Sequence, residues 1–207
     1  MREAGLLAVR DELGGEHLDI PRSRAFALAD HQIAHIYVRD PHDLLRARAA
    51  VEALPGVARV LDDAGKAHHG LDHPRSGELV ALSEMDSWFT YYYSSDDAHA
   101  PDFARTVDIH RKPGYDPVEL FLDPSLSFPK LSIGWRIAKK AMGFRTLMDL
   151  IPLDAGLVMG SHGRADTPAE HAPVFITSEP KLVPEGMAVD AVRIKDIVLD
   201  YLFGNPT

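Results

Sequence analysis

Cysteine is absent from the 207 residues of the sequence. Disulfides and thiolate nucleophiles are therefore excluded, and a metal ion would have to bind through histidine, aspartate or glutamate. No apolar run reaches the length of a membrane span, and residues 1–19 are too acidic for a signal peptide. We therefore expect a cytoplasmic protein without a membrane partner.

Positive charge is scarce, since 22 Lys and Arg against 31 Asp and Glu give a formal net charge of −9. Such a chain repels a phosphate polymer on average, so we expect no nucleic-acid partner, although a local metal ion can still attract a phosphate group. Histidine, in contrast, is plentiful with 11 residues. It is the commonest transition-metal ligand.

Several catalytic signatures are also missing. The sequence contains no internal repeat, no phosphate-binding P-loop, no dinucleotide fingerprint and no Gly-x-Ser-x-Gly motif. The enzyme class that these absences do not exclude is a hydrolase that uses a metal-activated oxygen.

The order of apolar patterns predicts an α/β or α+β fold, with a mixed sheet and helices packed on it. A strand–helix–strand–strand order over residues 20–95 predicts a small α+β subdomain. Residues 1–19 are predicted as a lead-in formed by a helix or by a helix entering a strand. Residues 96–207 would hold a metal-binding loop and a C-terminal α/β portion. One compact unit for the whole chain is the alternative.

The clearest predicted helix follows Asp40, a good N-cap with Pro41 at the first helical position. Its apolar stripe repeats at helical spacing and stops at Pro55-Gly56. Strands are predicted around this helix, one or two in residues 24–40 and one in each of two later stretches, residues 58–63 and 77–84.

Two further helices are predicted in the second half of the chain. Residues 130–151 read as a basic amphipathic helix that Gly143 interrupts, and residues 188–204 read as a closing helix that Gly204 ends.

The segment Gly160-Ser161-His162-Gly163 places a histidine between glycines. Glycine lets a backbone turn sharply and approach an ion or a phosphate closely. The alternative is a tight turn whose histidine hydrogen-bonds a neighbour, and the residues alone leave both interpretations open.

Asp108 and His110 form a second candidate metal site. In an extended segment, residues two apart face the same side, so both side chains could meet one ion. Arg111 and Lys112 follow and supply positive charge suited to a phosphate oxyanion. The alternative is an Asp–His hydrogen bond that braces the loop, with the basic pair solvated.

The dipeptide Asp30-His31 also has metal-binding residue types. The apolar alternation around it predicts a strand, on which neighbouring residues face opposite ways. Partly buried strand residues are therefore the favoured interpretation.

Together, these segments resemble the C-terminal half of the type I phosphodiesterase/nucleotide pyrophosphatase family of the alkaline-phosphatase superfamily. The similar features are the Gly-x-His-Gly motif at 160–163, the apolar stretch 173–177, the helix at 189–203 and the strand–helix–Leu-Pro-Gly-Val–strand order over 34–61. The resemblance implies an alkaline-phosphatase-like fold and a strand at 173–177.

The resemblance also implies the chemistry of the site. His162 would be one ligand of a two-metal centre, usually zinc, with Asp108 and His110 as candidate further ligands. The candidate phosphate contacts are Arg111, Lys112 and Arg164.

The family's reaction also requires a Thr or Ser nucleophile, an Asp-x-x-x-His pair and an Asp-His-Gly motif. The sequence holds no convincing counterpart, since Asp30-His31 is followed by Gln32. We therefore expect the C-terminal part of a metal-dependent phosphodiesterase-like protein, inactive alone and without catalytic residues of its own. Its partners would be a phosphate ester or a complementary N-terminal half.

A rival hypothesis is a non-catalytic protein-binding or assembly module that self-associates. The aromatic stretch 88–93 and the loop 110–120 would form its interface. A self-sufficient hydrolase is disfavoured, because Asp30 and His31 would have to converge with Asp108, His110 and His162.

Overall fold

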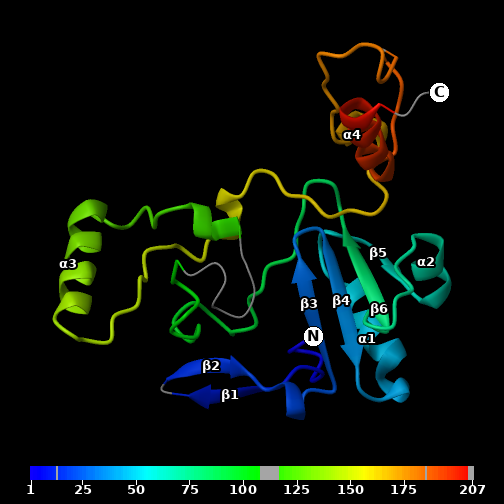
Figure 1. Cartoon of the computed structure of the whole chain (residues 1–207). Helices are drawn as coiled ribbons and strands as arrows, with labels where there is room; N and C mark the ends of the chain where they lie inside the picture. The colour runs from blue at the N-terminus through cyan, green and yellow to red at the C-terminus, as the bar shows by residue number, and fades with distance from the viewer. Residues whose placement is uncertain (13, 108–116, 185, 205–207) are drawn as a thin grey trace. The chain divides into compact units, whose positions relative to one another are not determined.

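The structure is a computed structural model that describes residues 1–12, 14–107, 117–184 and 186–204. The chain divides into two compact units, Met1–Asp166 and Thr167–Thr207 (Figure 1). Strands and helices both occur, and the α+β alternative for the fold class is confirmed.

The main sheet has four strands in the order β3 (Ala25–Asp30), β4 (Ile33–Val38), β6 (Leu79–Ser83) and β5 (Val57–Leu61). Every pairing in this sheet is antiparallel, which corrects the expected mixed sheet. A parallel pair would need a crossover of a dozen residues or more, whereas β3 and β4 are joined by a two-residue turn. All four strands lie within residues 20–95.

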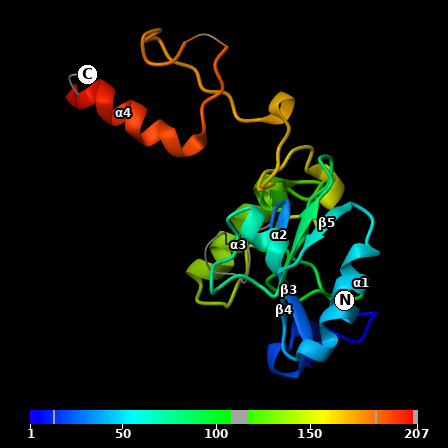
Figure 2. The same ribbon diagram turned by 90° about the vertical axis from the view of Figure 1, so that its right-hand side faces the viewer.

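The predicted helix after Asp40 is confirmed as a 3₁₀ turn, Pro41–Asp43, that continues into α1 (Leu44–Glu52). The Asp40 carboxylate accepts a hydrogen bond from the His42 N–H at 2.9 Å, as an N-cap should. The helix α1 packs beside β5 (Figure 2). A short helix that the sequence did not predict, α2 (Asp63–His68), begins at the Asp62 cap.

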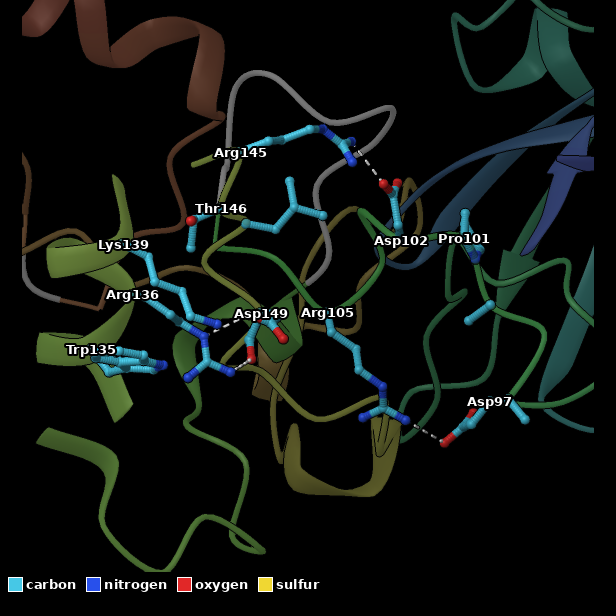
Figure 3. A pocket seen from close by; sticks show the side chains of 13 residues that line it. Asp97, Pro101, Asp102, Arg105, Trp135, Arg136, Lys139, Arg145, Thr146 and Asp149 are labelled. Atoms are coloured by element: carbon cyan, nitrogen blue, oxygen red, sulfur yellow. Dashed lines mark hydrogen bonds and ion pairs between the residues drawn. The ribbon is translucent and has the colours of Figure 1, made fainter. Parts of the chain in front are cut away.

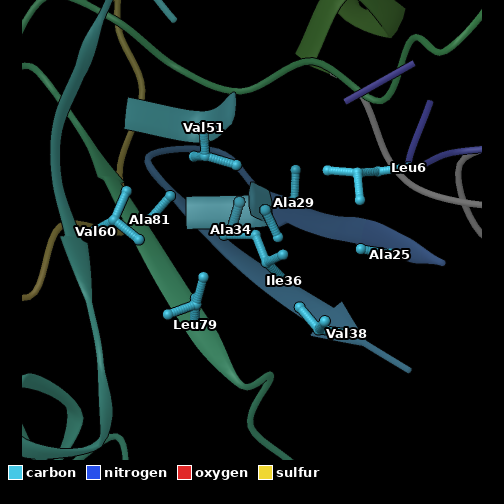
Figure 4. Packing of buried hydrophobic residues seen from close by; sticks show 11 residues of the cluster. Leu6, Ala25, Ala29, Ala34, Ile36, Val38, Val51, Val60, Leu79 and Ala81 are labelled. Atoms are coloured by element: carbon cyan, nitrogen blue, oxygen red, sulfur yellow. The ribbon is translucent and has the colours of Figure 1, made fainter. Parts of the chain in front are cut away.

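The core lies on both faces of the sheet, and β6 supplies residues to each. Leu79 and Ala81 join the larger cluster, in which α1 also takes part (Figure 4). Val80 and Leu82 face the opposite way and pack with Leu61. All five residues of β6 are buried, because this strand is central and both of its faces are covered.

The expectation of a helix in residues 1–19 is not met. The chain forms turns and then the hairpin of β1 (Val9–Glu12) and β2 (Gly15–Leu18). Leu6 is buried in the core, and its carbonyl accepts hydrogen bonds from the Arg24 and Ala25 N–H groups. These tertiary contacts hold the segment in a non-helical path.

The predicted basic helix at 130–151 is confirmed up to Gly143, as α3 (Pro129–Ala141), whereas residues 144–151 form no helix. Gly143 has φ +87°. None of its residues is buried. In the second unit, the predicted closing helix is α4 (Ile194–Phe203). Gly204 ends it in the left-handed conformation, and its N–H bonds the Asp200 carbonyl at 3.0 Å.

The strand expected at 173–177 does not form. Val174 is 82% exposed and Ile176 is 86% exposed, so their apolar side chains have no sheet face to cover. An apolar run becomes a strand only where a partner strand accepts its hydrogen bonds, and no described strand pairs with it.

Among the described residues, no helix combines the length and the apolarity that a membrane span needs.

Candidate functional site

The loop that carries His162 lies against the turn between β3 and β4. The His162 ring stacks on the His31 ring, with 4.1 Å between the ring centroids and 28° between their planes. The Gln32 N–H donates to the His162 carbonyl at 2.9 Å. A side-chain contact and a backbone hydrogen bond thus join two segments about 130 residues apart.

The contacts of His31 define what we call the histidine cluster: Asp30, His31, Ser161 and His162. The Nδ1 atom of His31 lies 3.0 Å from the Ser161 hydroxyl oxygen, and its Nε2 atom lies 3.9 Å from an Asp30 carboxylate oxygen. His31 is buried, whereas His162 is exposed. The exposed ring of the pair is therefore the one that the Gly-x-His-Gly motif carries.

The two glycines beside Ser161-His162 differ in their surroundings. Gly163 has φ +111°, and a side chain there would place its Cβ 3.1 Å from the Asp30 carbonyl oxygen. Gly160 has no atom within 4 Å of that position. The close approach that Gly163 permits is therefore an approach to the β3–β4 turn.

Arg164 ties the same loop to the end of β6. Its Nη1 donates to the Ser83 carbonyl at 2.6 Å, and its Nε and Nη2 bond one Asp166 carboxylate oxygen at 3.2 and 2.8 Å. The side chain is only 10% exposed. A phosphate contact by Arg164 stays a prediction, and the guanidinium would have to exchange these partners to make it.

The other four predicted site residues lie outside the described part of the chain. They are Asp108, His110, Arg111 and Lys112. Their roles as metal ligands and phosphate contacts stay predictions.

The described residues could supply one ligand of a metal site, but they do not make up a complete site. Within the described ranges, no group of three His, Asp or Glu residues could hold an ion. Imidazole lone pairs lie in the ring plane, so two rings stacked at 28° do not converge on one ion. The described residues of the histidine cluster therefore do not by themselves form a metal site.

Sequence reasoning missed the contact between His31 and Ser161. His31 was assigned to a strand, but it stands in the turn with φ +57°. Such a turn normally carries Gly, Asn or Asp, and the pair His31-Gln32 has none of them.

Comparison with known proteins identifies the family. The model of the type I phosphodiesterase / nucleotide pyrophosphatase family matches residues 1–116, more than half of the 207 residues, and the chain belongs to this family. The relatives that the match indicates are hydrolases of the phosphodiesterase and pyrophosphatase type. His162 lies beyond the matched segment.

One solved structure is similar over a short stretch. It is the crystal structure of phosphonoacetate hydrolase from Sinorhizobium meliloti 1021 in complex with phosphonoacetate. The similar part covers 33% of this chain at 21% identity, with a TM-score of 0.29. The chain spans 20% of the length of that hydrolase. No curated protein matches the chain.

Proposed function

We propose that this chain is the C-terminal, metal-binding part of a phosphodiesterase-type hydrolase and is inactive alone. The observation that carries the proposal is the exposed His162 ring, which a glycine-flanked loop holds against the β3–β4 turn. Family membership supports the hydrolase class. A complementary N-terminal half would supply the nucleophile, and a phosphate ester would be the substrate.

His162 would hold a divalent metal ion, zinc by the family resemblance, with Asp108 and His110 as proposed further ligands. When bound, such an ion polarises a phosphoryl oxygen as a Lewis acid. The chain's own contribution is orientation. The His31 ring supports one face of the His162 ring, and the Gln32 N–H and the Arg164 guanidinium fix the loop on either side of it.

The isolated chain is expected to hydrolyse bis(4-nitrophenyl) phosphate no faster than buffer, with added zinc or manganese. The physical reason is that the sequence offers no counterpart of the family's nucleophile, and a metal ligand alone cannot form the covalent intermediate. Release of nitrophenolate measures the rate. Metal-dependent turnover well above the buffer rate would contradict the expectation.

If such turnover were observed, two variants would show which residue it depends on. Ser161 is the hydroxyl that lies within hydrogen-bond distance of a histidine in the cluster, at 3.0 Å from His31. Loss of turnover in Ser161→Ala would identify it as a nucleophile, whereas loss only in His162→Ala would identify the metal ligand.

A second candidate function, an assembly module, is favoured by one face of α3 and its flanks. Apolar residues recur there at alternating spacings of three and four, the pattern of a seam between two helices. We call this set the α3 seam: Phe128, Leu131, Trp135, Ala138 and Met142. Leu131 is 72% exposed and Met142 is 58% exposed, which leaves the seam open to a second copy of the chain.

The interface that the sequence predicts for this module differs from the α3 seam. Residues 88–93 are half-buried, and Phe89 and Tyr91 pack against the core. Part of the loop 110–120 lies outside the described residues. The role of both segments in an interface stays a prediction.

Self-association through the α3 seam is expected to increase with salt. Residues 124–148 contain five basic residues and no acidic one, so two copies repel each other across the seam. Raising the salt from about 0.1 to about 1 M shortens the Debye length from about 10 to about 3 Å and removes this repulsion. Sedimentation velocity measures the mass.

Leu131→Glu should keep the chain monomeric at high salt, because a charge would enter the seam. Leu45→Glu is the control, since Leu45 is 80% exposed on α1. Equal behaviour of the two variants, or a monomeric wild type at every salt concentration, would rule out the seam.

A further inference from the structure

A cavity of about 650 Å³ lies beside α3, away from the histidine cluster. Its walls come from residues 97–105, from α3 and from residues 145–149 (Figure 3). None of the described residues that line it belongs to the histidine cluster, and Arg164 is not among them. The cavity therefore needs an explanation of its own.

Among the described residues that line this cavity, basic side chains outnumber carboxylates by one, in contrast to the acidic chain as a whole. Four basic side chains line it, Arg105, Arg136, Lys139 and Arg145, against the three carboxylates Asp97, Asp102 and Asp149. The carboxylates are already paired with Arg105, Arg145 and Arg136, at 3.5, 2.9 and 2.6 Å respectively.

Lys139 differs from the three arginines of the cavity. Among the described residues it has no carboxylate partner, and its Nζ lies 5.4 Å from the centroid of the Trp135 ring. The Arg136 hydrogen bond lowers the pKa of Asp149, with Lys139 as a lesser cause, so this carboxyl stays ionised near neutral pH. The Asp149 carboxylate is paired with Arg136, and Lys139 forms no ion pair with a carboxylate of the described residues.

Two arginines keep donors available as well. Among the described residues, Arg145 bonds Asp102 alone, through its Nη2, and its side chain is 76% exposed. Arg105 approaches Asp97 and Asp123 at 3.5 and 3.8 Å, too far for strong hydrogen bonds. Guanidinium groups held in this way by carboxylates are pre-oriented and still present N–H donors to an anion.

Trp135 adds a flat apolar surface at the same cavity. The residue is 57% exposed, and apolar atoms of Pro101 and Leu147 also line the cavity. An indole of this kind stacks with an aromatic ring.

We propose that this cavity binds a small aromatic phosphate. Its phosphoryl group lies against Lys139 and its ring lies on Trp135, while Arg105 and Arg145 line other walls of the cavity (Figure 3). The binding requires no metal ion and no residue of the histidine cluster. It is therefore independent of the proposed hydrolase function.

The test is calorimetric titration of the full chain with phenyl phosphate, with EDTA present to remove metal ions. Inorganic phosphate lacks the ring and phenol lacks the anion, so each should bind at least about fivefold more weakly, the lower limit expected for one lost stacking or charged contact. His162→Ala should leave the affinity for phenyl phosphate unchanged.

Matched variants locate the site. Lys139→Gln should weaken phenyl phosphate binding at least about fivefold, as should Trp135→Leu, whereas Trp135→Phe should retain most of the affinity. Lys140→Gln is the control, because Lys140 is the exposed neighbour on α3 and does not line the cavity. Since α3 has no buried residue, these variants should keep the wild-type far-UV circular dichroism.

Three results would overturn the proposal. The first is the absence of binding heat with phenyl phosphate. The second is an equal loss of affinity in Lys139→Gln and Lys140→Gln, which would indicate only a general electrostatic attraction by the basic helix. The third is binding of inorganic phosphate as tight as that of phenyl phosphate.

Discussion

Gly77→Ala is expected to lower the free energy of unfolding by about 3 kcal/mol, the upper part of the range for overpacking a tight site. A Cβ at residue 77 would lie 2.5 Å from the Ile36 carbonyl oxygen and 2.7 Å from its nitrogen. Both are backbone atoms of the central strand β4. The side chain therefore cannot be accommodated by a rotamer change, and the backbone has to move.

A shift of the Gly77 backbone would disturb two hydrogen bonds. The Gly77 carbonyl accepts from the Nζ of buried Lys66 at 2.9 Å, and the Gly77 N–H donates to the Nδ1 of His35 at 3.2 Å. Burial, with a smaller effect of Lys66, lowers the pKa of His35, which keeps this imidazole neutral and able to accept. Displacing Gly77 weakens both bonds and leaves a buried ammonium without one of its acceptors.

The measurement is denaturant-induced unfolding of Gly77→Ala beside Gly134→Ala. Gly134 lies inside α3 with no atom within 4 Å of the added methyl group, so alanine there should raise stability by up to about 1 kcal/mol through helix propensity. Opposite signs are expected for the two variants. A Gly77→Ala chain as stable as the wild type would mean that β4 does not approach Gly77 so closely.

Much of the fold could be predicted where local chemistry decides it. Asp40 and Pro41 specify a helix start whatever the surroundings, and Gly204 specifies a helix end. The apolar alternation of residues 24–40 predicted the two strands β3 and β4 correctly, because each of these strands has one face towards the core.

The remaining elements depend on contacts that no local pattern encodes. Residues 1–8 are held by the burial of Leu6 and by its carbonyl bonds to Arg24 and Ala25. The apolar run 173–177 has strand-forming residues but finds no partner strand among the described residues. In both cases tertiary context overrides propensity.

The candidate site was predicted in part. The glycines around His162 could be recognised in the sequence, and Gly163 does permit a close approach. That His31 would be the neighbour could not be inferred, because the turn residues His31-Gln32 carry no turn signal and the contact spans about 130 residues.

Zinc titration of the wild type and of His162→Ala tests the central claim most directly. A histidine binds a metal ion through a lone pair on one of its ring nitrogens, which alanine cannot supply. We expect the wild type to bind zinc and the variant to lose at least about tenfold in affinity, the lower end of what even indirect contacts to a metal contribute. His171→Ala, at an exposed histidine of the second unit, should bind as the wild type does. Identical isotherms for the wild type and His162→Ala, or no binding in either, would contradict the account.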